Sequence, residues 1–518
     1  MIFKKSGLAA LAAIGVLLAG CATDTGDGPK DSIAVAYAAQ PPNLDPQLSA
    51  SATTTGLTRP VFETLLTMDE NRKPTPMLAE SFERSPDGLK YTFHLRHGLK
   101  FQNGSDLDAD DVVASMERWS RLAPPVIDDF KGATWTKTDP YTVVLQVPHE
   151  SFLHILQLSS RFANYPAIMP KEIVDAAGDN PVQDIVGTGP YRFVEWVPDQ
   201  HLTLEKWDGY QPQSGAISGL AGDKTGKLNK IVFNFVTDPS TRTLGLQSGQ
   251  YDISTEAPYE GLDQMYADPK LQVGTFTVSP QNLIYSGRQG SPVANVAMRQ
   301  AINAALDRDE IMIAAVGRKD LYDLVQHNMV KSQETLWHTN VGLATFNKPD
   351  PDKVKALLKE AGYHGQPLVM TVTRDYTESY NAAVVVQSQL QKAGINVELQ
   401  TLEWASYFEQ FLNRQDSWDM SVFPQVPQLD PSQTVGFSSA RPGFWSTPRL
   451  NDLLTKYRNA PTLEAAAAMY DEMQQYIEDT RPLSRLGDVH EVFAASTNLQ
   501  QIPTFDGSAV WWAVDFKR

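Results

Sequence analysis

The first third of the chain alternates apolar and polar positions in short runs that predict strands. Ile33–Tyr37 and Tyr91–Leu95 show this alternation, and residues 140–147 and 191–206 show it again. After the second run, Asp108 stands where an N-cap is expected, ahead of a helix through Val112 to Trp119. This part of the chain therefore predicts a mixed α+β domain.

From about residue 280 the pattern becomes helical, and apolar positions recur three or four residues apart. Pro351 at a first helical position and Gly362 just beyond the end delimit one such helix. A strand at 367–373, a helix at 377–393 and a strand at 395–402 follow, which predicts parallel pairing through a right-handed crossover. We also expect helices at 448–458 and 463–478. The last 30 residues, ending at Val510–Val514, look strand-like and are expected to rejoin the first domain.

The N-terminus has the three parts of an export signal. Lys4 and Lys5 supply positive charge, Leu8–Leu18 is apolar but too short to span a bilayer, and Leu18-Ala19-Gly20 precedes Cys21. This run matches the bacterial lipobox, in which the cysteine carries the lipid. An ordinary signal peptide with a chance cysteine is the alternative. Because Cys21 is the sole cysteine, an internal disulfide is impossible, and we expect signal 1–20, lipidation at Cys21 and a flexible tether over 21–31.

Charge and size narrow the class of function. Removing residues 1–20 leaves 498 residues and changes the net charge from −17 to −19, because two lysines are lost. So acidic a chain is a poor partner for nucleic acid, and its length predicts two or three domains. His94 and His97 are the two histidines whose spacing best suits a metal site, but no Cys or further His lies nearby in the sequence, so no metal is expected. No acid–base pair or nucleophile shows a recognisable spacing, so no catalytic residue or cofactor is expected either.

Several short motifs, in the same order, resemble the peptide/nickel-type solute-binding proteins of ABC importers, the large three-domain class. Each motif alone is weak evidence, but the occurrence of all of them in the family's order is specific for this family. They include Pro42–Pro46, Val61–Leu66, Pro76–Phe82, Ser85–Arg96, Asp110–Val112, Gly187–Tyr191, Leu246–Ile253, Arg299–Ile302, Ala305–Arg308 and Leu357–Gly362.

The resemblance implies a two-lobed periplasmic-binding-protein-like fold, α/β with α+β. Lobe I is expected from 32–66, 186–277 and 487–518, with an extra subdomain at 67–185, and lobe II from 278–486. Such proteins close on a small-molecule or peptide ligand and pass it to an ABC permease. The implied protein is an exported, membrane-anchored monomer on the outer side of the cytoplasmic membrane, at the cell surface or in the periplasm.

The family's dipeptide-binding members imply a ligand site in segment 372–445. They use an arginine for the ligand carboxylate, a tyrosine two residues later and a tryptophan about 30 residues on. Arg374, Tyr376 and Trp404 fill these places, and Tyr407 follows in the same pattern. The alternative is that Arg374 forms an internal ion pair and that Trp404 belongs to the core.

One position departs from that pattern. Val426 or Pro427 stands where the family's aspartate binds the ligand ammonium, which argues against free peptides. An oligosaccharide or opine receptor, a cell-wall hydrolase and a purely structural or signalling lipoprotein remain as alternatives. Further candidates for the cleft are Tyr285, Arg288, Gln425, Gln428, Asp430 and Trp445.

Overall fold

The computed structural model describes most of the chain from residue 30 onward. The described residues are 30–518 except 50, 125, 128, 161–163, 288–289, 335, 414–416, 435–436, 438–446 and 506. The expected signal, Cys21 and most of the tether lie outside them, as do Arg288 and Trp445. No helix within the described ranges is long and apolar enough to cross a membrane.

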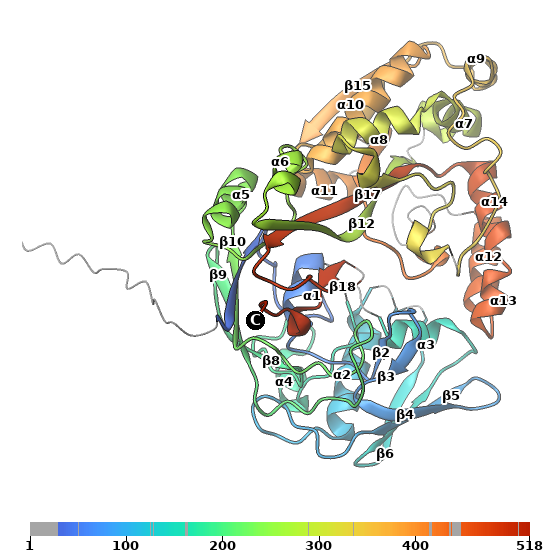
Figure 1. Ribbon diagram of the computed structural model, residues 1–518. Coiled ribbons are helices and arrows are strands. Elements are labelled where there is room, and N and C mark those ends of the chain that lie inside the picture. The colour runs from blue at the N-terminus through green and yellow to red at the C-terminus, as the bar shows by residue number, and fades with distance from the viewer. Residues whose placement is uncertain are drawn as a thin grey trace, which may run out of the picture.

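One large sheet of eleven strands runs through both lobes (Figure 1). Ten of its strands form a continuous series, and β13 (Tyr322–Asp323) pairs with β17 beside it. The series is β15 (Val397–Leu402), β14 (Leu368–Thr373), β16 (Met420–Pro424), β12 (Leu271–Tyr285), β17 (Leu483–Ser496), β11 (Ile253–Ser254), β1 (Ser32–Tyr37), β10 (Lys230–Phe235), β9 (His201–Lys206) and β8 (Tyr191–Val197).

Lobe I is built on the end of this sheet that holds β1. Its core joins β1, β9 and β10 to the C-terminal residues, where the indole of Trp511 donates to the carbonyl of Gly56 over 3.1 Å. The C-terminal residues thus pack in the same core as β1. The other elements of lobe I are α1 (Ala52–Thr58), β18 (Thr504–Phe505) and β19 (Ser508–Ala509). Although α5 (Pro239–Ser248) and α6 (Leu262–Ala267) fall in the span expected for lobe I, their buried Leu246, Leu262 and Met265 pack in the core of lobe II.

The extra subdomain has its own four-stranded antiparallel sheet and its own core. Asp108 caps α2 (Ala109–Leu122) as predicted, and α2 packs Val112, Met116 and Trp119 onto that sheet. The sheet order is β4 (Ala79–Arg84), β5 (Lys90–Leu95), β7 (Thr142–Gln146) and β6 (Thr134–Asp139). The remaining elements are β2 (Leu66–Met68), β3 (Pro74–Pro76), α3 (Leu153–Leu158) and α4 (Lys171–Ala177).

Lobe II contains the predicted strand–helix–strand unit. β14 and β15 pair in parallel, and α10 (Thr377–Lys392) covers one face of β14 while α11 (Trp404–Asn413) covers the other. The other helices are α7 (Val296–Ala305), α8 (Arg308–Val316), α9 (Pro351–Glu360), α12 (Pro448–Arg458), α13 (Leu463–Ala467) and α14 (Tyr470–Thr480). The single helix predicted over 463–478 is thus two helices.

Two long antiparallel strands, β12 and β17, connect the lobes. They pair from Leu271 opposite Ser496 to Ile284 opposite Leu483, with two irregularities in register. The boundaries expected at 278 and 487 both fall inside these strands, so the chain passes between the lobes as continuous sheet rather than as loops. We call β12 and β17 the crossing strands.

The lobes also touch far from these strands, where the extra subdomain meets the α12–α14 side of lobe II (Figure 1). The amide of Phe152 donates to the carbonyl of Ala460 over 3.0 Å, and the hydroxyl of Ser151 donates to the carbonyl of Arg458. Phe152, Leu153 and Leu156 share one apolar core with α12 and α14. We call this region the interlobe contact.

The last strand expectation fails at residues 510–514. Trp511–Ala513 form one 3-10 turn, and Trp511 and Trp512 are each 1% exposed. Bulky apolar residues in sequence give the same pattern in a buried turn as in a buried strand, so periodicity alone does not separate the two.

Candidate ligand-binding site

Arg374 lies at the carboxyl end of β14, where α/β sheets place ligand-binding groups. Its side chain is exposed, and its guanidinium carbon lies 5.2 Å from the ring centre of Tyr380. Within the described part of the chain it makes no ion pair, so the internal ion pair weighed above is not seen. Its charge is available to a ligand.

Aromatic rings form a wall beside Arg374. Tyr376 and Trp404 meet edge to face with ring centres 4.8 Å apart, and Phe408 lies 5.4 Å from Trp404. Asp375 fixes this arrangement, because its carboxylate accepts the amide of Trp404 at the start of α11 over 2.6 Å. Tyr376 is 38% exposed and Phe408 37%, so the wall keeps faces on which a ligand can pack.

Three carboxylates gather where the crossing strands meet lobe I and α10. The amide of Ala257 donates to the carbonyl of Val492 over 2.7 Å, which sets Glu256 beside Glu491 on β17. Glu491 pairs in register with Thr277 of β12, and Ser379 binds Gln281 of the same strand over 2.8 Å, which brings Glu378 to this strand pair. Among the described residues none of the three carboxylates makes an ion pair, and the side chain of Glu378 hydrogen-bonds only its own backbone. We call Glu256, Glu378 and Glu491 the acidic cluster.

The acidic cluster holds its protons unusually tightly. Burial by surrounding protein, followed by the charges of Glu256 and Glu378, raises the pKa of Glu491 to about 8. Burial and the charge of Glu256 raise the pKa of Glu378 to about 7, and burial also raises the pKa of Glu256. All three side chains nevertheless keep solvent contact.

Tyr376 links the acidic cluster to the aromatic wall. Burial and then the charges of Glu256, Glu378 and Glu491 raise the pKa of its hydroxyl far above the ordinary range. Tyr376 is therefore part of both the ring wall and the surroundings of the three carboxylates, and Arg374 stands two residues before it on the same segment.

The loop after β16 borders the site without adding a charge to it. Gln425 is half-buried, and its amide oxygen accepts from the side chain of Asn282. Gln428 accepts through its carbonyl from Gln333 over 2.7 Å. Val426 is 58% exposed, so the loop presents an apolar side chain where the family pattern has a carboxylate.

Two predicted residues are core residues and one caps a turn. Tyr407 and Tyr285 are fully buried, and their hydroxyls bind Ser421 over 2.7 Å and Ser484 over 2.8 Å. Since both rings and both hydroxyls are already occupied, neither faces a ligand in this conformation. Asp430 is 1% exposed and accepts from the amide and hydroxyl of Ser432, so it lies in the protein interior.

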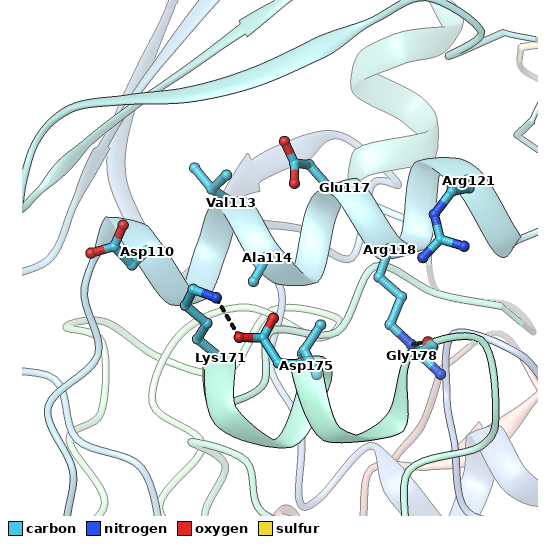
Figure 2. Close-up of a pocket in the computed structure, with 10 residues that line it drawn as sticks. Asp110, Val113, Ala114, Glu117, Arg118, Arg121, Lys171, Asp175 and Gly178 are labelled. Atoms are coloured by element: carbon cyan, nitrogen blue, oxygen red, sulfur yellow. Dashed lines mark hydrogen bonds and ion pairs between the residues drawn. The ribbon is translucent and has the colours of Figure 1, made fainter.

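A separate groove lies between α2 and α4 on the extra subdomain (Figure 2). It measures 330 Å³ and is lined by charged side chains. Most of them are already paired, as Lys171 is with Asp175 and Arg121 with Asp179, and Arg118 donates to the carbonyl of Gly178 over 3.0 Å. This groove is a poor candidate for a ligand site.

The remaining sequence motifs have structural roles. His97 packs on Tyr141 with ring centres 4.0 Å apart, and the described residues contain no group of His, Cys, Asp or Glu that could hold a metal. Gly187 and Gly189 approach the backbone of Val61 and Pro60 so closely that a Cβ would lie 2.1 and 2.3 Å from a carbonyl oxygen. These glycines serve chain packing rather than phosphate binding.

The acidic cluster is the part of the site that the sequence interpretation missed. Glu256, Glu378 and Glu491 come from three distant segments, and only pairing of β11 with β17 brings the first and last together. Glu378 stands two residues after Tyr376, which was the one local signal of its role.

Comparison with known proteins places this geometry in one family. Residues 73–441 match the family described as bacterial extracellular solute-binding proteins, family 5 Middle. The chain is 26% identical over 460 residues to a protein of Sinorhizobium fredii named as a probable peptide ABC transporter periplasmic-binding protein, which covers 84% of this chain and 85% of that one. It is 28% identical over 409 residues to the glutathione-binding protein GsiB of Escherichia coli K12, covering 77% and 74% of the two chains.

A solved structure supports the same fold. The periplasmic binding protein DppA of Helicobacter pylori, in complex with the peptide STSA, superposes with a TM-score of 0.79 at 22% identity, over 95% of this chain and 99% of that one. The match over residues 73–441 agrees with the order of the sequence motifs and with the two-lobed fold. This chain therefore belongs to the family 5 bacterial extracellular solute-binding proteins.

Proposed function

We propose that this protein is the ligand-binding subunit of an ABC importer for peptides or related ligands that carry both an acid and an amine. The observation that carries the proposal is the position of Tyr376 between two groups of opposite charge: the exposed guanidinium of Arg374, two residues before it, and the acidic cluster, whose charges act on its hydroxyl. Arg374 would bind a ligand carboxylate bidentately, and the acidic cluster would bind an ammonium or guanidinium group. Trp404 and Tyr376 would pack against the apolar part.

The acidic cluster would answer the objection raised by the loop at Val426. A free peptide loses its charge partner there, and a buried unpaired ammonium is costly. Glu256, Glu378 and Glu491 supply negative charge from another direction, so the amine would sit over the crossing strands rather than over the loop. Two of the relatives are named as a probable peptide transporter protein and a glutathione-binding protein, and both names favour the same ligand class.

Delivery to the permease requires a lobe movement. A ligand that touches Glu256 of lobe I and Glu378 of lobe II favours the closed form, because it binds both lobes together only there. The permease would recognise that closed form. We further propose that Cys21 carries the lipid anchor, which would keep the receptor at high effective concentration beside its permease.

Calorimetric titration with a library of short peptides, amino acid conjugates and oligosaccharides tests the ligand class. We expect binding by members with both charges, and Arg374→Ala should weaken the binding of such a ligand by about 10- to 100-fold, the effect of losing a charged hydrogen bond. Arg192→Ala, which removes an exposed arginine of β8, is the matched control and should leave affinity unchanged. Tight binding of an uncharged sugar that is indifferent to Arg374→Ala would refute the proposal.

The anchor has its own test. Metabolic labelling with a fatty acid should label the expressed protein, and Cys21→Ser should abolish the label and release the protein from membranes. Equal labelling of the Cys21→Ser protein would refute lipidation at this residue.

A further inference from the structure

Two side-chain amides meet at the end of β16, beside the aromatic wall. The side chain of Asn282 on β12 donates to the amide oxygen of Gln425, the first residue after β16. Asn282 is 1% exposed, and its own amide oxygen, Oδ1, has no hydrogen-bond partner. A buried carbonyl group without a donor is costly, so a donor supplied from outside the protein would be stabilising here. We call Asn282 and Gln425 the amide pair.

The register of the strands places the amide pair in line with the carboxyl end of β14. Asn282 pairs with Phe423 of β16, the strand that lies between β12 and β14. Ser421 of β16 pairs with Thr371 of the parallel strand β14. Phe423 lies two residues further on and therefore stands level with Thr373, the last residue of β14. Neighbouring strands lie about 4.8 Å apart, so Asn282 is about 10 Å across the sheet from this strand end, a distance that a short extended peptide spans.

The side chain of Asn282 shares a face of the sheet with the aromatic wall. Directly paired residues of neighbouring strands present their side chains to the same face, so Asn282 lies beside the ring of Phe423. That ring stacks with the rings of Trp404 and Phe408, whose centres lie 6.4 and 6.3 Å away. Because Gln425 is half-buried and Asn282 is buried, a ligand that packs on the aromatic wall meets the amide pair on the Gln425 side.

The amide pair offers one free donor and one free acceptor. With Asn282 as donor of the shared hydrogen bond, its oxygen and the amide nitrogen of Gln425 are left over, and the described residues provide no acceptor for that nitrogen. Turning both amides over exchanges the roles and again leaves one donor and one acceptor. A carboxylate only accepts and an ammonium only donates, whereas an amide does both. The pair is therefore complementary to an amide group rather than to a charged end of a ligand.

We propose that the amide pair is a subsite for an amide group of the ligand, such as a peptide bond or a carboxamide side chain. The N–H of that group donates to the free oxygen, and its carbonyl oxygen accepts from the free amide nitrogen. Arg374 holds the ligand carboxylate at the other end of the row, and the aromatic wall covers the part between. The site then distinguishes a peptide from an ester or an amino acid of equal charge. The inference rests on the proposed function, because it concerns the same site.

A small amide tests the subsite without knowledge of the full ligand. N-methylacetamide carries one donor and one acceptor, and methyl acetate has the same shape without the donor. In protein labelled with nitrogen-15, N-methylacetamide should shift the side-chain amide signals of Asn282 and Gln425, which are assigned by their loss in Asn282→Leu and Gln425→Met. Methyl acetate should shift them about tenfold less at equal concentration. Equal shifts with the two compounds, or no shift with N-methylacetamide, would overturn the proposal.

A charged ligand tests the same subsite by calorimetry. Lysyl-alanine should bind about tenfold more tightly than its depsipeptide, in which an oxygen replaces the peptide N–H, because one buried hydrogen bond is lost. Gln425→Met keeps the length of the side chain but removes its polar atoms and the bond that orients Asn282, so this ratio should fall to about one. Gln391→Met, an exposed residue near the other end of α10, is the control and should keep the ratio. Since Gln425 is half-buried in a loop, its variant should fold even if Asn282→Leu does not.

The two experiments separate this inference from the proposed function. Binding of lysyl-alanine and its depsipeptide with equal affinity to the parent protein refutes the amide subsite and leaves the proposed function intact. A selective response to N-methylacetamide, without binding of any doubly charged member of the peptide library, supports the subsite and counts against the proposed function alone.

Discussion

Replacing Glu491 by glutamine should make the ligand-free protein more stable in alkaline solution. Glu491 lies on β17, and burial and the neighbouring Glu256 and Glu378 raise its pKa from 4.5 to about 8. Its folded pKa exceeds its unfolded pKa, so the native state binds the proton more tightly. Stability is therefore lost as pH rises from about 4.5 to 8 and is unaffected by this group below that range.

The magnitude follows from the shift. Each pKa unit corresponds to about 1.4 kcal/mol, so the full difference would destabilise the folded state by about 5 kcal/mol at pH 8 and above. Glu491 keeps partial solvent contact and shares the repulsion with two other carboxylates, so we expect Glu491→Gln to recover about 2 kcal/mol. At pH 4.5 the variant and the parent should be equally stable.

Thermal unfolding monitored by circular dichroism between pH 4.5 and 8.5 measures this effect. The midpoint of Glu491→Gln should rise above that of the parent only as pH increases, whereas Glu117→Gln, on the exposed face of α2, should follow the parent throughout. A variant less stable than the parent at pH 8 would refute the reasoning, because it would mean that the carboxylate of Glu491 is stabilised by a partner. Glu491→Gln should also weaken binding of any cationic ligand.

Three further changes test other parts of the structure. Gly189→Ala should lower the free energy of unfolding by about 2 kcal/mol or more, because its Cβ would lie 2.3 Å from the carbonyl oxygen of Pro60; urea unfolding measures this. Arg118→Met should cost about 3–5 kcal/mol in the same assay, because it leaves Asp45, which is 0% exposed, without its ion-pair partner at 2.7 Å. Trp404→Ala should weaken ligand binding about tenfold by calorimetry, with Trp404→Phe intermediate, since the ring wall loses its middle member.

The parts of the fold that depend on local signals could be predicted from the sequence. The helix capped by Asp108 and the unit of β14, α10 and β15 each depend on a cap or a periodicity within about 35 residues. β12 and β17 gave no such signal. They bury polar side chains such as Gln281 and Asp488, and their pairing joins residues 199 to 225 positions apart.

The same distinction, between local sequence signals and contacts between distant segments, explains which residues of the candidate ligand site could be predicted. Arg374, Tyr376 and Trp404 share one family motif, so their positions could be named before the structure was known. Tyr407 belongs to the same motif but faces inward, because its place on α11 turns it toward Ser421 and Val422. A motif records which residues lie on one segment, while the face each presents depends on what packs against that segment.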